Sequence, residues 1–114
     1  VDLLSKVHQT SAKYDATQDE FEEIGFEKTY IDGFQAPFIQ GLPISVGMEF
    51  LEEHLIQTNN TRLIVGEVKH ILINESLIDD DGYIDTSMAN TILVSGLDAY
   101  HSHDHIKRMD YARP

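Results

Sequence analysis

The sequence predicts a mainly β protein of the β-barrel type with short helices. Residues 44–56 alternate apolar with smaller or polar side chains, which is the period of a half-buried strand. Residues 62–74 form a second run rich in Leu, Ile and Val, and residues 58–61 between the runs are a turn sequence. The two runs therefore predict an antiparallel hairpin. Residues 28–31 and 91–97 predict shorter strands, and several strands joined by turns are typical of a barrel.

Two short helices are predicted before the hairpin. Residues 2–9 have the pattern of a helix end, since their apolar side chains recur at helical spacing. A second helix is expected over residues 19–24, because Thr17 or Asp19 can cap its N-terminus and Gly25 can end it. Both helices are too short to form a layer of their own, so they are expected to flank the strands.

The length and composition of the chain restrict its class. A chain of 114 residues can form one domain, 1–114, and is too short for two. Twenty acidic residues against eight basic ones give a net charge of −12, which argues against nucleic acid and anionic membrane surfaces as partners. Because there is no cysteine, the chain has neither disulfides nor a thiolate metal site. No apolar run approaches the ~20 residues that span a bilayer, and a cytoplasmic location is expected.

An acidic segment at residues 79–85 resembles the middle of a calcium-binding loop. The EF-hand pattern would place its first ligand at Leu77 and its bidentate acid at Met88, and neither side chain can bind calcium. The segment is therefore predicted to be an acidic turn without a metal.

Three histidines alternate along a second polar segment. In an extended chain His101, His103 and His105 would point the same way, as a Zn²⁺ or Ni²⁺ site requires. Three histidines on one polar tail are more often surface residues, because metal ligands usually come from distant parts of a fold. Metal binding by this segment stays open as an alternative, and no metal ligand is assigned.

Four segments of the chain form an ordered pattern. They are Thr10-Ser11-Ala12-Lys13-Tyr14 with Asp19-Glu20-Phe21-Glu22-Glu23 and Gly25; Ala36-Pro37-Phe38-Ile39; Gly66-Glu67-Val68; and Gly96-Leu97-Asp98-Ala99-Tyr100 with Arg108-Met109-Asp110-Tyr111-Ala112-Arg113-Pro114. In this order they resemble the flavin reductase-like (flavoredoxin-type) family, whose fold is an FMN-binding split β-barrel. The first and fourth segments are the more specific ones.

The resemblance implies that the chain corresponds only to the C-terminal part of that domain, and hence to a partial FMN-binding split β-barrel. Family members carry upstream barrel strands and a Ser/Thr-rich stretch that holds the FMN phosphate, and this sequence begins after that point. A natural truncation, a proteolytic product and a gene fragment are all compatible with such a start. The expected flavin site is therefore incomplete in this chain.

The resemblance also implies candidate flavin-binding residues, and no catalytic residue is assigned. Thr10, Ser11 and Lys13 offer two hydroxyls and an ammonium near the flavin phosphate and ribityl chain. The alternative is a polar linker that caps a turn.

In the closing segment, Tyr100 and His101 would bring aromatic faces toward the flavin or a dimer interface, and Arg108 would supply scarce positive charge. The alternative is that Tyr100, Tyr111 and Pro114 simply anchor the end of the chain.

Three functions follow as hypotheses. The first is an FMN-dependent oxidoreductase-like domain, in which reduced nicotinamide, NAD(P)H, gives electrons to the flavin. The second is a truncated, non-catalytic β-domain that forms a homodimer without flavin. The third is metal binding by the His-rich segment. Self-association is expected in the first two, because a partial barrel exposes strand edges and apolar faces.

Overall fold

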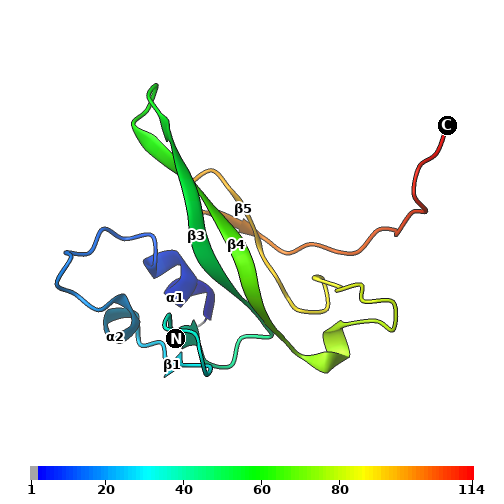
Figure 1. The fold of residues 1–114 in the computed structure, drawn as a ribbon, viewed down its shortest axis with the longest axis horizontal. Coiled ribbons are helices and arrows are strands. Elements are labelled where there is room, and N and C mark those ends of the chain that lie inside the picture. The colour runs from blue at the N-terminus through cyan, green and yellow to red at the C-terminus, as the bar shows by residue number, and fades with distance from the viewer. Residues whose placement is uncertain (1–2) are drawn as a thin grey trace. The chain divides into compact units, whose positions relative to one another are not determined.

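The structure, a computed structural model, describes residues 3–114, and the chain divides into two compact units, Val1–Ile73 and Asn74–Pro114. Asp2, included in the first predicted helix, lies outside the described residues. The first unit contains α1 (Leu3–Gln9), α2 (Glu20–Ile24), β1 (Lys28–Thr29), β2 (Phe38–Ile39), β3 (Ile44–Ile56) and β4 (Thr61–Ile73) (Figure 1). The second contains a 3₁₀ turn, η1 (Glu75–Leu77), and the strands β5 (Leu93–Ser95) and β6 (Ala99–His101).

The strands form three separate two-stranded antiparallel sheets, β1–β2 and β3–β4 in the first unit and β5–β6 in the second. This confirms a mainly β chain with short helices. Within residues 3–114 the sheets do not close into a barrel. In the same part of the chain, no helix has the length and hydropathy needed to cross a membrane.

The second helix begins and ends as its sequence predicts. Asp19 is the N-cap, since its Oδ1 accepts a hydrogen bond of 3.0 Å from the Phe21 N–H. The other carboxylate oxygen of Asp19 is paired with the Lys28 ammonium at the start of β1. Gly25 ends the helix with φ +75°, the left-handed conformation that glycine adopts without strain. The cap residue therefore fixes both the helix start and its link to β1.

The hairpin of β3 and β4 has the limits that the sequence predicts, to within one residue. Asn60 takes a positive φ of 56° in its turn. The Asn59 Oδ1 accepts hydrogen bonds from Thr61 N (3.2 Å) and Thr61 Oγ1 (2.7 Å), which closes the turn locally.

Two β-bulges interrupt the hairpin. Gly47 pairs with His70 and Met48 pairs with Val68, so Lys69 of β4 has no partner in the ladder. In the same way Leu51 of β3 is an extra residue. Bulges of this kind bend a strand and increase its twist.

One side of the hairpin, which we call the apolar face, carries a continuous set of apolar side chains. Its members, defined by cross-strand pairing and alternation, are Val46, Met48, Phe50, Val68 and Ile71. Each is about half exposed or more, from 48% for Val46 to 65% for Phe50. The expectation of a half-buried strand is therefore wrong for this face within the first unit, because no described element of that unit covers it.

The opposite side of the hairpin contributes to the core of the first unit. Phe38, on β2, is buried, and its ring lies 5.4 Å from that of Phe34. The Phe34 ring also makes an edge contact of 5.0 Å with the His70 ring. Gly47 is buried beneath these rings, and a Cβ placed there would lie 2.9 Å from Phe38 Cζ. Glycine is thus needed at this position for close packing.

The second unit has a small core of its own, in which Leu77 and Ala89 are buried. A local turn follows Asp85, whose Oδ1 accepts hydrogen bonds from the Ser87 N–H (2.9 Å) and hydroxyl (2.5 Å). After β6 the chain has no regular secondary structure. Tyr111 is 86% exposed, so the prediction that it anchors the end of the chain is wrong.

Candidate functional site

The first group of candidate residues lies in the polar loop that follows α1. Thr10 continues the helix end, because its N–H bonds the Lys6 and Val7 carbonyls and its hydroxyl donates to the Val7 carbonyl at 2.7 Å. Ser11 follows with its N–H bonded to the His8 carbonyl at 3.0 Å. The loop is therefore built as a frayed continuation of the helix.

The donors left in this loop decide whether it can hold a phosphate. The Thr10 hydroxyl proton is engaged, whereas the Ser11 hydroxyl and the Lys13 ammonium are exposed and make no hydrogen bond or ion pair with residues 3–114. These two groups suit a phosphate oxygen. The carbonyl end of α1 carries partial negative charge, which opposes an anion beside Thr10. The loop therefore fits a phosphate through Ser11 and Lys13, and Thr10 would first have to release Val7.

The second group of candidates lies on β6 and beyond it. Tyr100 is partly buried on β6 and pairs with Val94 of β5. Neighbouring His101 is exposed, and its Nε2 lies 2.8 Å from the Ser95 hydroxyl. The short β5–β6 sheet therefore sets the position of both aromatic side chains.

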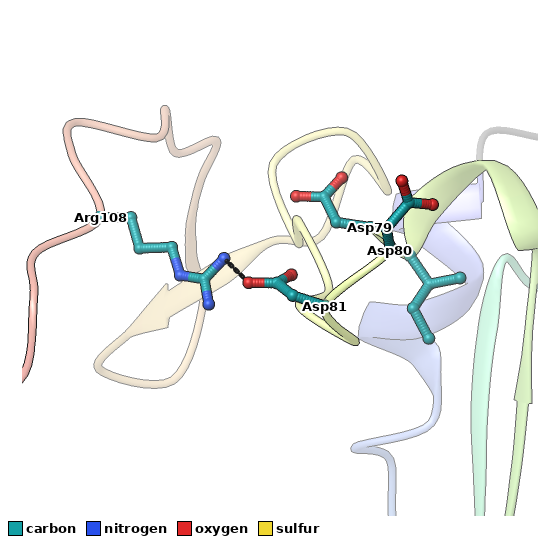
Figure 2. A pocket seen from close by; sticks show the side chains of 5 residues that line it. Asp79, Asp80, Asp81 and Arg108 are labelled. Atoms are coloured by element: carbon teal, nitrogen blue, oxygen red, sulfur yellow. Dashed lines mark ion pairs between the residues drawn. The ribbon is translucent and has the colours of Figure 1, made fainter.

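Arg108 is held by an acidic turn of the same unit. Its Nη1 lies 2.6 Å from the Asp81 carboxylate (Figure 2). The Arg108 guanidinium also lies 4.5 Å from the centre of the Tyr83 ring. Both Asp81 and Arg108 are about half exposed. The hydrogen bond from Arg108, with a second from the Tyr83 N–H, lowers the pKa of the Asp81 carboxyl below its usual 3.8. Asp81 engages one nitrogen of this guanidinium and offsets its charge, which lowers its attraction for a phosphate.

The segment around Asp81 is an acidic turn, as its sequence predicts. The Asp79 N–H bonds the Tyr83 carbonyl at 2.8 Å, and the Gly82 N–H bonds the Asp79 carbonyl at the same distance. Together with Ile78 and Asp80, the turn and Arg108 line an open depression (Figure 2). One guanidinium offsets one of its three carboxylate charges, so it has the character of a net acidic surface turn.

The three alternating histidines do not converge. His101 contacts Ser95, His103 Nε2 lies 2.6 Å from the Thr91 hydroxyl, and His105 Nδ1 lies 3.1 Å from the Tyr83 hydroxyl. Each imidazole thus contacts the hydroxyl of a different residue. Over residues 3–114, no group of three or more His, Asp or Glu side chains is placed to hold a metal ion.

One concave feature was not identified from the sequence. A pocket of about 310 Å³ lies in the first unit, between the α1 residues Leu3 and Lys6 and the chain around Phe26 and Ile39. The Lys6 ammonium donates to the Gly25 carbonyl and lies 5.3 Å from the centre of the Phe26 ring. Lys6 therefore bridges α1 and the end of α2. No local pattern marks these residues, because they lie about 20 positions apart.

Comparison with solved structures gives two matches. The first is a "putative flavin reductase with split barrel domain" from Shewanella frigidimarina NCIMB 400, with a TM-score of 0.88 and 32% identity over 96% of this chain. The second is flavoredoxin of Desulfovibrio vulgaris (Miyazaki F), with a TM-score of 0.74 and 15% identity over 93% of this chain, a likeness that concerns the fold alone. This chain spans 56% of the length of each. No protein-family model matches it, and no curated protein matches it significantly.

The fold defines the class as a mainly β chain with short helices, and the first match is described as having a split-barrel domain. Within that class, the matches support a place for this chain in the flavin reductase-like split-barrel family, which confirms the resemblance found in its sequence.

Proposed function

We propose that this chain is part of an FMN-binding, flavin reductase-like oxidoreductase domain that passes electrons from NAD(P)H to flavin. The observation that carries the proposal is the 32% identity and TM-score of 0.88 to a protein described as a flavin reductase. In this proposal residues 1–114 belong to one domain, a partial split β-barrel that works in the cytoplasm. Because the chain spans 56% of its relative, the remaining barrel strands would come from outside this sequence.

Within the first unit, we assign Ser11 and Lys13 to the flavin phosphate, with Thr10 as a further hydroxyl ligand. Lys13 is the stronger candidate, because it is an exposed ammonium in a chain with a net charge of −12. A charge-assisted hydrogen bond to phosphate is roughly twice as strong as a neutral one. The affinity of this loop for phosphate should therefore depend mainly on Lys13.

Within the second unit, Tyr100 and His101 are the candidates for contact with the flavin ring. Tyr100 is the better placed of the two, because it is partly buried whereas His101 is exposed. Arg108 is a weaker candidate, since its charge is already paired with Asp81. The flavin supplies the redox chemistry when bound, so these residues need only bind and orient it.

The apolar face of the hairpin favours a second candidate function, a non-catalytic β-domain that forms a homodimer. Met48, Phe50 and Val68 are 50% or more exposed on one side of a long hairpin. A contiguous exposed apolar patch of this kind is typical of an association surface. Self-association is compatible with both candidates, and only the first requires flavin.

Titration of FMN with the purified chain separates the two candidates. Quenching of flavin fluorescence, checked by equilibrium dialysis, should show saturable binding. The Lys13→Gln variant should weaken it by about tenfold, because a hydrogen bond to a charged group contributes roughly 1.5–3 kcal/mol. Lys69→Gln is the matched control, since the Lys69 ammonium is already paired with Glu67 at 2.5 Å.

One outcome would exclude flavin binding by this chain, and another would exclude the loop as the phosphate site. A chain that leaves added FMN fully fluorescent and dialysable would exclude it and leave the non-catalytic dimer. If binding is found but Lys13→Gln and Lys69→Gln behave alike, the phosphate does not lie at this loop. Oxidation of NADPH in the presence of FMN then tests the electron transfer itself.

A further inference from the structure

The chain contains two Asp–Gly pairs, Asp32–Gly33 in the first unit and Asp81–Gly82 in the second. In such a pair the backbone nitrogen of the glycine can attack the carboxyl carbon of the aspartate, because glycine has no Cβ to obstruct the approach. The N–Cγ bond forms, the carboxyl hydroxyl leaves with the amide proton as water, and a cyclic imide, the succinimide, results. Water then opens this ring at either carbonyl. Opening at the main-chain carbonyl gives isoaspartate, whose main chain is longer by one methylene.

The two glycines have similar backbone geometry. Gly33 has a φ of +77° and Gly82 a φ of +82°. A Cβ placed at either one would have no atom of its own unit within 4 Å outside the adjacent residues. Crowding therefore does not distinguish the two pairs. The attack joins atoms of adjacent residues, so the hydrogen bonds of each pair decide how freely it reacts.

The Asp81–Gly82 pair is held at both reacting groups. The Gly82 N–H donates to the Asp79 carbonyl at 2.8 Å, which engages the nitrogen that would attack. One oxygen of Asp81 accepts a hydrogen bond of 3.2 Å from the Tyr83 N–H, and the other lies 2.6 Å from Arg108 Nη1 (Figure 2). The hydrogen bond from Arg108, and then that from Tyr83, lower the pKa of the Asp81 carboxyl. This reduces the amount of the carboxylic acid, which is the form that loses water.

The Asp32–Gly33 pair lacks these restraints. Neither the Asp32 carboxylate nor the Gly33 N–H makes a hydrogen bond or an ion pair with the described residues of its unit. The pair lies at the centre of a turn that the Phe34 N–H closes by donating to the Ile31 carbonyl at 3.3 Å. This hydrogen bond bridges the pair from outside and leaves both reacting groups free to approach each other.

A methylene inserted at Asp32 would affect the core of the first unit. It would enter the turn just before Phe34, whose ring lies 5.4 Å from the Phe38 ring and 5.0 Å from the His70 ring. The lengthened turn would no longer match the spacing of the hydrogen bond between Phe34 and Ile31. Isomerisation at this position would therefore loosen the packing of the Phe34 ring.

We propose that Asp32 is a site of spontaneous isomerisation, through a succinimide with Gly33, and that the contacts of Asp81 and Gly82 protect the second pair. The reaction needs no cofactor, partner or enzyme. The proposal therefore goes beyond flavin binding and does not depend on it.

Ageing of the purified full chain at mildly acidic pH tests the proposal. Peptide mapping with electron-transfer dissociation measures isoaspartate at each site. The same ageing in guanidinium chloride gives the rate of each pair in the unfolded chain. Folding should slow Asp81 at least about tenfold more than Asp32, because three contacts must open before Asp81 reacts. Asp32→Glu is the control: its longer side chain would have to close a larger ring, so position 32 should stay unmodified.

Two variants of Arg108 test the protection of Asp81. Arg108→Gln removes the ion pair and should raise isoaspartate at Asp81 at least about threefold, without changing the yield at Asp32. Arg108→Lys keeps a cation beside Asp81 and should raise it less. Equal slowing of the two sites by folding, or no isoaspartate at Asp32 in the folded chain, would overturn the proposal. An unchanged yield at Asp81 in Arg108→Gln would overturn the protective role of the ion pair.

Discussion

The close packing at Gly47 gives the sharpest test of the fold. An alanine Cβ at this position would lie 2.9 Å from Phe38 Cζ, 3.1 Å from Phe34 Cζ and 3.3 Å from His70 Cβ. Real Cβ atoms do not approach a ring carbon to 2.9 Å, so Gly47→Ala must move Phe38, one of the buried side chains of the first unit. Overpacking of this kind costs about 1–3 kcal/mol.

A smaller gain opposes this cost. Alanine loses less backbone entropy than glycine on folding, which contributes about 0.5–1 kcal/mol in a strand. The expected net loss in the free energy of unfolding is therefore about 1–2 kcal/mol. With a urea dependence of about 1–3 kcal/mol/M for a small protein, the unfolding midpoint should fall by about 0.5–1 M.

Urea unfolding followed by far-ultraviolet circular dichroism measures this change, because the chain has no tryptophan to report it. Combining Gly47→Ala with Phe34→Leu should recover part of the loss, since the smaller side chain makes room for the new methyl group. Gly41→Ala is the control, because Gly41 has a φ of +81° and no atom within 4 Å of a Cβ placed there. Its loss in the free energy of unfolding comes from backbone strain alone, so it should add to the loss caused by Phe34→Leu. The packing argument would be refuted if Gly47→Ala left the urea unfolding midpoint unchanged. It would also be refuted if the losses in the free energy of unfolding caused by Gly47→Ala and Phe34→Leu were additive.

Three further predictions concern local interactions. Asp19→Ala should lower the free energy of unfolding by about 1 kcal/mol, because α2 loses its N-cap. Asp19→Asn keeps an N-cap, so its loss of stability, measured by thermal unfolding, should be smaller. Arg108 lowers the pKa of Asp81, so the Asp81 carboxylate stabilises the fold above its unfolded pKa of about 3.9, and this contribution is lost as the pH falls through the lower folded pKa. In the Arg108→Gln variant, carbon-detected NMR titration should show the pKa of Asp81 rise toward 3.8. An unchanged pKa would exclude an effect of the ion pair. Asn60 has a φ of 56°, so Asn60→Ala should lower the free energy of unfolding by roughly 1 kcal/mol, whereas Asn60→Gly should change it little. Equal urea unfolding midpoints for the two variants would contradict a strained turn.

The local features of the fold could be predicted from the sequence. The hairpin follows from alternation and a turn rich in asparagine, and α2 follows from Asp19 and Gly25, because both signals lie within the element they define. The bulges at Leu51 and Lys69 could not be predicted, since they depend on how two strands pair. Burial was predicted wrongly for the same reason: alternation marks which side chains share a face, and only the rest of the fold determines whether that face is covered.

The candidate site was predictable to a lesser degree. Thr10, Ser11 and Lys13 are ordinary loop residues, and only the family resemblance marked them out. The pairing of Arg108 with Asp81 joins residues 27 positions apart, so no local pattern could indicate that its charge is compensated. For the same reason, the alternation of the histidines could not indicate that each imidazole contacts a separate hydroxyl.

The bulge at Lys69 has a consequence for how the hairpin can change in length. Since Lys69 has no partner, its deletion would join Val68 to His70 and leave Gly47 as the partner of His70. The ladder would become regular over these residues, and no neighbouring strand would have to shift. Deletion of Val68 or His70 would also make the ladder regular, but Lys69 would then take the place of the lost side chain on the apolar face or beside Phe34. Related chains that differ by one residue in this strand should therefore differ at position 69, where the loss leaves the two faces intact.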